Sequence, residues 1–453
     1  MTTKIHSGLR LGRVFGVALL GCSLVLAGCD TDKLLEINDT DTVNPGTLDD
    51  PDLMDVVWAG ALGEFTTAYA GSGNDGFLSV SGLMSDELYS SGSFPTRTAT
   101  DRRNQDTPSN GNTSDGTYVN LHQARYALKD AARKVEEWEG ASHEYYRELK
   151  ALEAFTYLTL AEGFCSPIPF SEVAEGGGFE YGTPLGLDAI LDEALNLFNT
   201  AGADHLVAVG KGRTLLNKGE YAAAAAAVSG VPTNYVYWMY HSENGDRNAI
   251  YSLQGNGRYS LADNEGVNGL PFRSAMDPRV PWYRDPAQQW GFVETIPLYK
   301  SKRHYAFSAP VPLATGVEAR LIEAEAALQT GGNWLGILND LRAEVGTLMP
   351  GMFPGYDVVN PTLSPLTDPG TEAGQRALLF EERAFWLFGT GHRLGDLRRL
   401  VREYGLNQAD VYPTGDYFKS GPFGVDVVWP LDFDEEGNNP NYQHSMCDVT
   451  SAG

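Results

Sequence analysis

The residue types that usually carry catalysis are present in this chain, but few of them fall at catalytic spacings. The eight histidines are scattered, and neither HExxH, the zinc hydrolase pattern, nor GxSxG, the serine hydrolase pattern, occurs. Residues 71–76 match the letters of the dinucleotide-binding GxGxxG motif, but they follow an expected helix instead of a strand. Residues 432–437 imitate the start of a calcium loop whose twelfth position is Gln443 instead of Glu. We therefore expect no enzyme activity, cofactor or metal site, although the many carboxylates leave a glycosidase pair open.

Cys29 is the residue whose surroundings predict a specific modification. A basic start precedes the apolar stretch 14–28, which is too short to span a membrane but suits a secretory signal. The stretch ends in Leu-Ala-Gly-Cys, which resembles a lipobox, the site where a bacterial lipoprotein is diacylated on cysteine and cleaved. A second candidate ends at Cys22 with a shorter apolar region, and ordinary secretory cleavage is the other alternative. We expect a signal peptide over 1–28, lipidation of Cys29, and a tether over 29–50.

Cys165 and Cys447 are the cysteines that remain if Cys29 carries lipid. An even remainder in an exported protein indicates one disulfide. The bond would close a loop of 282 positions, for which the chain-entropy model gives a stabilisation of about 5 kcal/mol as an upper value. Two free buried thiols are the alternative.

The composition describes a folded, acidic protein. Hydrophobic residues make up 42% of the 453 positions and aromatic residues 11%, so a large core can form and general disorder is excluded. The formal net charge is −26, and removal of residues 1–28 would take away three basic and no acidic residues and bring it to −29. Such a surface repels phosphate backbones, so we expect no nucleic-acid partner.

Helical periodicity recurs through the chain. The stretches 212–228 and 316–345 share one order, in which a helix reaches a glycine turn and a second helix begins soon after. Such pairs resemble tetratricopeptide repeats of about 34 residues. The predicted fold class is all-α, with tetratricopeptide-like helical repeats and large irregular loop insertions over a body at 51–453. The predicted helices cover 52–70, 118–139, 142–164, 185–199, 212–228, 316–330, 334–345, 372–389 and 392–404.

Two segments have no sustained helical period. The first, 71–112, is rich in Gly, Ser, Asn and Thr and is predicted to be a long surface excursion. The second, 231–310, holds 14 aromatic residues in 80 positions, about 17% against 11% for the chain. Aromatic side chains in an irregular insertion can stack on sugar faces or apolar side chains, although most of them could instead pack the insertion's own core.

Several motifs along the chain resemble those of the SusD/RagB family of outer-membrane nutrient-binding lipoproteins. The early ones are the lipobox, the LLEIN segment that follows it, Ser-Asp-Glu at 85–87 and FCSPIPF at 164–170. Asp277-Pro278-Arg279 is similar to a family Asp-Pro-Arg, and 318–331 is similar to the family's central helix. Their order extends over nearly the whole mature chain, so the resemblance implies a SusD-like helical-repeat fold.

The C-terminal third carries further family-like motifs and two departures. Glu382-Arg383, then Gly-x-Arg ending at Arg393, then Asp-Leu-Arg beginning at Asp396, resemble the family's signature in that order. Trp-Pro-Leu at 429–431 and Asn-Pro-Asn-Tyr at 439–442 are similar to its closing motifs. Family members often have Glu where this chain has Thr390, and a closing cysteine such as Cys447 is not a general family feature.

The resemblance implies a function in nutrient capture. A lipid-anchored protein at the outer membrane, facing the exterior, would bind a glycan or peptide and pass it to a SusC-like TonB-dependent transporter. The helical repeats would supply the docking surface, and residues 77–97 and 231–307 would face the ligand. A secreted helical hydrolase and a repeat scaffold without a small ligand are the alternatives. The predicted ligand-binding residues are Asp86, Tyr89, Arg97, Trp238, Tyr240, Trp282, Tyr283 and Trp290.

The C-terminal signature also has a structural interpretation. Arg383 and Arg393 are each expected to reach a carboxylate, Glu382 or Asp396, on neighbouring helices. Bidentate arginine–carboxylate pairs fix the geometry between helices, so we predict a structural ion-pair network here instead of a ligand contact. The Asp-Pro-Arg segment is predicted to be a capped turn.

Overall fold

The computed structural model describes residues 48–105, 114–174 and 177–453. Residues 51–453 form one compact unit. The predicted signal peptide, the predicted lipidation site Cys29 and most of the predicted tether lie outside the described residues. Of the helices in the described ranges, none combines the length and the apolar character needed to cross a membrane.

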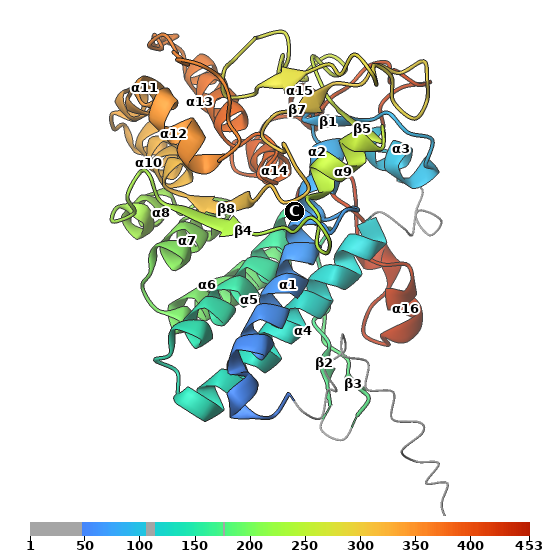
Figure 1. Cartoon of the computed structure of the whole chain (residues 1–453), viewed down its shortest axis with the longest axis vertical. Helices are drawn as coiled ribbons and strands as arrows, with labels where there is room; N and C mark the ends of the chain where they lie inside the picture. The colour runs from blue at the N-terminus through green and yellow to red at the C-terminus, as the bar shows by residue number, and fades with distance from the viewer. Residues whose placement is uncertain (1–47, 106–113, 175–176) are drawn as a thin grey trace, which may run out of the picture. The chain divides into compact units, whose positions relative to one another are not determined.

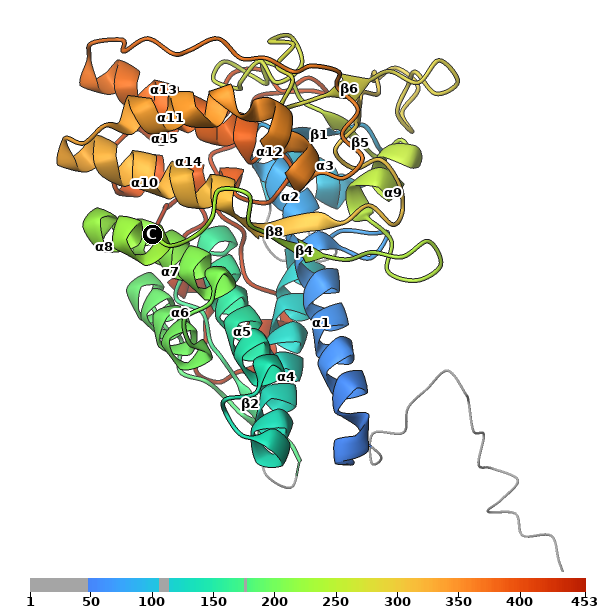
Figure 2. The ribbon, with the colours of Figure 1, turned by 60° about the vertical axis from the view of Figure 1, so that its left-hand side comes forward.

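Consecutive helices pack side by side in an extended array (Figures 1 and 2). In chain order each member contacts the next, from α1 through α4, α5, α6, α7 and α8 to α10 and α11. This is the arrangement expected of helix-pair repeats, in which each pair buries its apolar face against its neighbours. The all-α, helical-repeat prediction is confirmed. These helices are α1 (Met54–Ala70), α4 (Ser114–Glu139), α5 (Glu144–Gly163), α6 (Leu187–Ala201), α7 (His205–Asn217), α8 (Tyr221–Val228), α10 (Gly316–Thr330) and α11 (Trp334–Ala343).

The remaining helices complete the second half of the array and the region beside it. α10 packs against α13 as well as α8, and α14 contacts α5 and α2. The remaining elements are η2 (Pro51–Leu53), α2 (Phe77–Met84), α3 (Pro95–Asp101), α9 (Ala249–Gly255), α12 (Val345–Met352), α13 (Glu372–Trp386), α14 (Arg393–Arg402), α15 (Gln408–Val411), α16 (Asp434–Asn438) and η3 (His444–Met446).

α5 lies at the centre of the array, and its sequence explains why. Of its 20 residues 15 are buried, including two acidic residues, Glu153 and Glu162. A helix that is apolar over most of its circumference is stable only when neighbours cover it on several sides, and α4, α6, α1 and α7 do so.

Residues 71–105, the described part of the segment 71–112, are not the surface excursion that the composition predicts. All eight residues of α2 are buried, and β1 (Leu88–Ser90) and α3 follow within the same segment. Small residues are present here because the packing is close: a Cβ on Gly82 would lie 2.9 Å from the Leu88 side chain. The Gly and Ser content therefore reflects burial in the core, not exposure to solvent.

The aromatic-rich insertion is held by short strand pairs. β4 (Val236–Met239) pairs with β8 (Val311–Thr315), and β1 pairs across the fold with β5 (Tyr259–Leu261). The other antiparallel pairs are β6 (Trp282–Tyr283) with β7 (Lys300–Ser301) and β2 (Glu172–Val173) with β3 (Phe179–Glu180). The pairing of β1 with β5 brings the two irregular segments of the sequence together.

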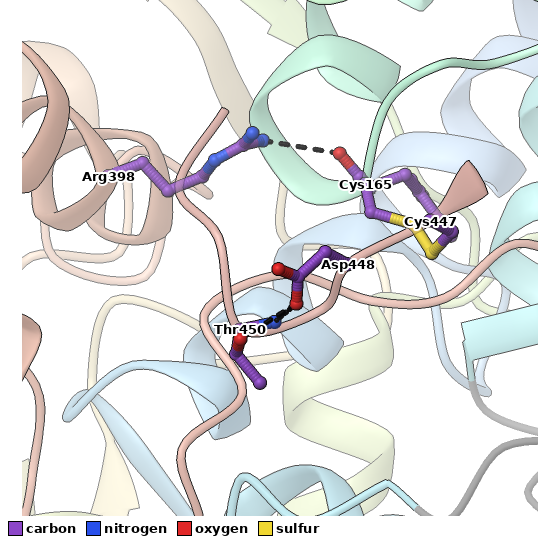
Figure 3. Close-up of a disulfide and its surroundings, with 6 residues drawn as sticks. Cys165, Arg398, Cys447, Asp448 and Thr450 are labelled. Atoms are coloured by element: carbon purple, nitrogen blue, oxygen red, sulfur yellow. Dashed lines mark hydrogen bonds between the residues drawn. A yellow bond between two sulfur atoms is a disulfide. The ribbon is translucent and has the colours of Figure 1, made fainter. Parts of the chain in front are cut away.

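The C-terminal tail is joined to the end of α5 by the predicted disulfide. Cys165 and Cys447 are bonded across 282 positions (Figure 3). Arg398 lies beside them, completely buried, and donates to the carbonyl of Ala452 at 2.9 Å and to that of Ala161. The disulfide and the arginine together fix the tail against α5 and α14.

Candidate functional site

Three cavities lie between the two irregular segments, and two of them are lined by residues 91–97, the loop after β1 together with the first turn of α3. Cavity A has a volume of about 480 Å³, cavity B about 250 Å³ and cavity C about 600 Å³. Cavities B and C share Ile296, Pro297 and Phe418, so they are adjacent. The loop contributes Gly92 and Ser93 to cavity C, and it contributes Phe94, Thr96 and Arg97 to cavity A. Residues of α3 line cavities A and C, and Tyr89 of β1 lines cavity B; α3 and β1 are labelled in Figure 1.

Hydrogen bonds to the insertion hold this loop in place. The Ser91 N–H donates to the Arg258 carbonyl at 2.9 Å, and the Ser91 hydroxyl donates to the Gly257 carbonyl at 2.9 Å. The Val293 N–H donates to the Ser91 carbonyl at 3.1 Å. Gly291 permits this approach, because a Cβ there would lie 2.5 Å from the Ser91 Cβ. The cavities therefore depend on contacts between residues more than 160 positions apart.

Cavity A combines polar groups with one exposed aromatic ring. Arg97 lies over the Phe94 ring at 4.9 Å, and Arg258 lies over the same ring at 4.8 Å. Arg97 is committed to Asp75 and Asn74, to which it donates at 2.8 Å each. Arg258 has no carboxylate of the described residues within ion-pair distance, and burial together with Arg97 lowers its pKa. The other polar lining residues are Thr67, Ser72, Thr96, Thr117, Asn120 and Asn256.

Apolar side chains line cavities B and C where the two cavities meet. The Tyr89 hydroxyl donates to the Pro297 carbonyl at 2.7 Å, and the Tyr89 ring packs edge-on against Phe418 at 5.1 Å. Lys419 donates to the Ser90 hydroxyl, the Gly92 carbonyl and the Thr98 hydroxyl at 2.9–3.1 Å. These contacts attach the C-terminal segment around Phe418 to the loop at 91–97.

Asp86 is not at the rim of a ligand site, which corrects the sequence-based prediction. It is 1% exposed, and Arg393 donates to its two carboxylate oxygens at 2.6 and 2.9 Å. The Leu270 N–H donates to the same carboxylate at 2.9 Å. The neighbouring Glu87 accepts from the Gly389 N–H at 2.9 Å. The Ser-Asp-Glu motif therefore joins α2, the insertion and the turn before α14.

The partners in the C-terminal ion-pair network also differ from those expected. Arg383 pairs with Asp396 at 2.9 Å, in agreement with the prediction. Arg393 pairs with Asp86 instead, and Glu382 accepts from Arg279 at 2.6 and 3.0 Å and from Arg342 at 2.5 Å. Glu382 and Arg383 do not pair with each other, because adjacent side chains on a helix point to different sides of it.

The Asp-Pro-Arg segment thus has a second role besides the predicted turn. The Asp277 carboxylate accepts from the Arg279 N–H at 2.8 Å, which closes the turn. The same guanidinium continues to Glu382 on α13. The turn therefore connects the insertion to the helical array through a buried arginine.

The predicted stacking aromatics are divided among separate places. Tyr89 lines cavity B and Arg97 lines cavity A, as described above. Trp282 and Trp290 belong to a row of alternating rings and guanidiniums that also includes Arg273, which lines cavity B, Tyr299 and Arg284. Tyr283, on β6, pairs with Lys300 and does not line cavity A, B or C.

Trp238 and Tyr240 lie elsewhere. Trp238 is on β4 beside β8, and its indole N–H points to the Met352 carbonyl at 3.4 Å. Tyr240 is 70% exposed, and its ring is 6.5 Å from that of Trp238. Neither lines cavity A, B or C.

Sequence reasoning missed Phe94, Arg258, Glu265 and Phe418 as cavity residues. Phe418 and Glu265 lie in segments without a motif, and only the pairing of β1 with β5 and the hydrogen bonds of Lys419 bring them to the loop. The sequence did contain a signal for Phe94, because its large apolar side chain directly follows the small residues 90–93.

A fourth cavity, cavity D, lies apart from these and has a volume of about 430 Å³. Tyr118, His122 and Phe179 line it together with Asp434 of α16. Part of residues 432–437, the segment with calcium-loop letters, therefore lies at this cavity, and the Asp432 carboxylate accepts from the Asp434 N–H at 2.9 Å. Within the described ranges no group of three or more His, Cys, Asp or Glu residues is arranged to hold a metal ion.

Comparison with solved structures identifies the fold of this chain. A SusD superfamily protein from Bacteroides vulgatus aligns over 89% of this chain and 99% of its own, with 14% identity and a TM-score of 0.60. Surface glycan-binding protein A from Bacteroides uniformis aligns over 87% and 99%, with 12% identity and a TM-score of 0.62. NanU from Bacteroides fragilis aligns over 88% and 99%, with 12% identity and a TM-score of 0.57. No protein-family model and no curated protein sequence matches the chain. The chain has the SusD-like fold.

Proposed function

We propose that this protein binds a soluble oligosaccharide at the cell surface and delivers it to a partner transporter. Cavity A carries the proposal. Its wall of hydroxyl, amide and guanidinium groups can bond sugar hydroxyls, and Phe94, which is 48% exposed, adds aromatic surface for a sugar to contact. Structural neighbours are named as a surface glycan-binding protein and a SusD-like carbohydrate binding protein, which supports a sugar ligand over a peptide.

The proposed role is binding without turnover. The ligand is captured by a preformed recess and released unchanged to a SusC-like TonB-dependent transporter, the partner implied by the family resemblance. The lipobox-like sequence at Cys29 supports attachment to the outer membrane through lipid, with the folded body facing the exterior. The helical array would supply the surface that docks on the transporter.

A glycan and peptide array on the soluble chain that begins after Cys29 tests ligand binding. We expect binding to a set of oligosaccharides, weaker by about tenfold or more in Phe94→Ala and Arg258→Ala. Phe433→Ala is the matched control, because Phe433 is also 48% exposed but lines none of cavities A, B and C. Binding of peptides alone, or equal binding by all variants, would contradict the proposal.

Two further measurements test the delivery role. Mass spectrometry of the membrane-extracted protein is expected to find diacylated Cys29 at the new N-terminus, and Cys29→Ala is expected to release the protein from the membrane. Affinity purification from native membranes is expected to recover a TonB-dependent transporter. Chromatography of a bound oligosaccharide after incubation is expected to return it intact, whereas shortened products would support the hydrolase alternative.

A further inference from the structure

Arg258 lines cavity A without a partner for its guanidinium. No carboxylate of the described residues lies within ion-pair distance of it, and no oxygen of those residues accepts a hydrogen bond from its side chain. The side chain is partly exposed, and its guanidinium nitrogens are accessible. The backbone is held on both sides, because the Arg258 N–H donates to the Leu253 carbonyl at 2.7 Å and the Arg258 carbonyl accepts from the Ser91 N–H at 2.9 Å. A cation on a fixed backbone therefore has N–H groups available for a ligand.

Aromatic rings restrict the position of this side chain. The guanidinium carbon of Arg258 lies 3.6 Å from the centroid of the Phe292 ring and 4.8 Å from that of the Phe94 ring. Gly92 leaves room for the aliphatic part of the side chain, because a Cβ there would lie 3.1 Å from the Arg258 Cδ. An arginine that is already stacked loses less conformational freedom when its N–H groups bind a ligand.

The neighbouring Arg97 has the counter-charge that Arg258 lacks. Arg97 also lies over the Phe94 ring, at 4.9 Å, but it pairs with the Asp75 carboxylate at 2.7 Å. The same carboxylate accepts from the Tyr259 hydroxyl and, at 3.3 Å, from the Ser79 hydroxyl. Asp75 is therefore fully engaged, and the positive charge of Arg258 remains without compensation.

The charges that line the cavities differ in sign. The described lining of cavity A holds two arginines and one carboxylate, that of Asp75. The lining of cavity B instead holds three carboxylates and one arginine, Arg273. Because the chain as a whole carries a net charge of −26, the positive excess at cavity A is a local departure from the composition. An anion beside Arg258 would also offset the repulsion from Arg97, which together with burial lowers the pKa of Arg258.

Other side chains of cavity A suit a sugar unit that carries such an anion. Asn120 and Asn256 line the cavity with amide groups that make no side-chain hydrogen bond in the described part of the chain. These amides can bond ring hydroxyls, and Phe94 adds aromatic surface. A guanidinium donates two parallel hydrogen bonds to the oxygens of an anionic group, which gives stronger bonds than neutral donors and acceptors do.

We propose that cavity A binds an acidic unit of an oligosaccharide, with the carboxylate or sulfate ester of that unit bonded to the guanidinium of Arg258. This inference rests on the proposed binding of glycans at cavity A and names the class of sugar unit. The carboxylate and the sulfate ester present the same anionic oxygens, and the experiment separates the two sources.

Isothermal titration of the protein at pH 6 with charged and neutral oligosaccharides tests the inference. Tetragalacturonate and a hyaluronan tetrasaccharide carry carboxylates, neocarratetraose sulfate carries sulfate esters, and methyl-esterified tetragalacturonate and cellotetraose are neutral. Wild-type protein is expected to bind at least one charged probe about tenfold or more tightly than both neutral ones. Preference for a uronate probe assigns the carboxylate, and preference for neocarratetraose sulfate assigns the sulfate ester.

Variants with matched controls locate the preference at Arg258. Arg258→Gln removes the charge and is expected to abolish the preference for the charged probe. Arg284→Gln is the control, because the Arg284 guanidinium also lies over two rings, those of Trp290 at 5.3 Å and Tyr299 at 5.7 Å, but does not line cavity A, B or C. Arg284→Gln is expected to bind all probes as wild type does. A preference that Arg258→Gln retains would overturn the inference.

A second variant keeps the inference open to refutation if Arg258→Gln fails to fold. Phe292→Ala removes a ring that is 55% exposed and holds the Arg258 side chain without lining cavity A. It is expected to weaken binding of the charged probe by about tenfold and to leave binding of the neutral probes unchanged. Equal weakening for charged and neutral probes, or no weakening, would contradict the role of the stacked guanidinium.

The remaining outcomes separate this inference from the proposed function. Neutral oligosaccharides that bind in a Phe94-dependent way as tightly as the charged probes overturn the acidic-sugar inference and leave the glycan function standing. Failure of every oligosaccharide on the array and in the titration to bind overturns both.

Discussion

Arg393 donates two hydrogen bonds to Asp86, at 2.6 and 2.9 Å, although the two residues are 307 positions apart in the chain. The guanidinium is at the first residue of α14, and the carboxylate follows the buried helix α2. Because Asp86 also accepts from the Leu270 N–H, this single carboxylate joins α2, the insertion and the C-terminal helices. The segment that carries the candidate site is thus fixed to the helical array by one buried ion pair.

Arg393→Ala is expected to lower the free energy of unfolding by about 3–5 kcal/mol, because it leaves the Asp86 charge buried without its partner. Denaturant unfolding followed by circular dichroism measures the change. Arg133→Ala is the control, since its ion pair with Asp130 is exposed and should cost at most about 0.5 kcal/mol. An unchanged free energy for Arg393→Ala would refute the structural role of the pair.

Replacement of Cys447 by Ala is expected to destabilise the protein by about 2–5 kcal/mol, the usual cost of losing a native disulfide. The bond constrains a long segment of the unfolded chain and fixes the tail beside Arg398. Thiol labelling of the denatured, non-reduced protein is expected to find neither Cys165 nor Cys447 reactive. Labelling of both would show that the bond does not form in the protein.

The stability of the protein is expected to depend on pH through Glu87. Burial is the main reason that its pKa rises to about 8, and Asp86 adds to the effect while the Gly389 N–H, Arg393 and Arg303 oppose it. A raised carboxyl pKa means that the folded state binds a proton that the unfolded state releases above about pH 4.5. The contribution of Glu87 to stability therefore falls as pH rises from about 4.5 to about 8, by up to about 1.4 kcal/mol per pH unit.

Glu87→Gln removes this dependence and keeps an oxygen to accept from the Gly389 N–H. Unfolding free energies at pH 5.5 and pH 8 are expected to favour the variant more at pH 8. A constant difference between variant and wild type at the two values would show that Glu87 is ionised in the folded protein.

Gly291→Ala is expected to displace the loop at 91–97, because the new Cβ would lie 2.5 Å from the Ser91 Cβ. Overpacking of this kind costs about 1–3 kcal/mol, and we expect a matching loss of oligosaccharide affinity. Gly230→Ala is the control, since no atom lies within 4 Å of the added methyl group. Normal affinity in Gly291→Ala would show that the loop position does not govern binding.

Trp238→Ala and Tyr240→Ala are expected to bind any oligosaccharide found on the array as tightly as wild type, because neither residue lines cavities A, B or C. Loss of affinity in either variant, with Phe94→Ala unaffected, would place the ligand against β4 instead. Titration of the three variants with the same oligosaccharide decides between the two surfaces.

The helices could be predicted closely where local signals are strong. The predicted bounds of α10 agree with the structure, since Thr315 caps its first turn and Gly331 has a left-handed backbone after its last residue. The surface prediction is wrong for the described part of 71–112, residues 71–105, because small residues favour both exposed loops and close-packed interiors, and composition alone does not distinguish the two. The burial of α2 depends on helices that are distant in sequence, among them α14.

The sequence by itself determined the helical repeats, the disulfide partners and the acidic charge, because periodicity, cysteine count and composition are properties of short segments or of the whole chain. Only the tertiary structure decided that Asp86 pairs with Arg393, that Trp238 and Tyr240 lie outside cavities A, B and C, and that Phe418 lies beside Tyr89. These relationships join residues hundreds of positions apart, and their partners are chosen by packing between elements instead of by spacing along the chain.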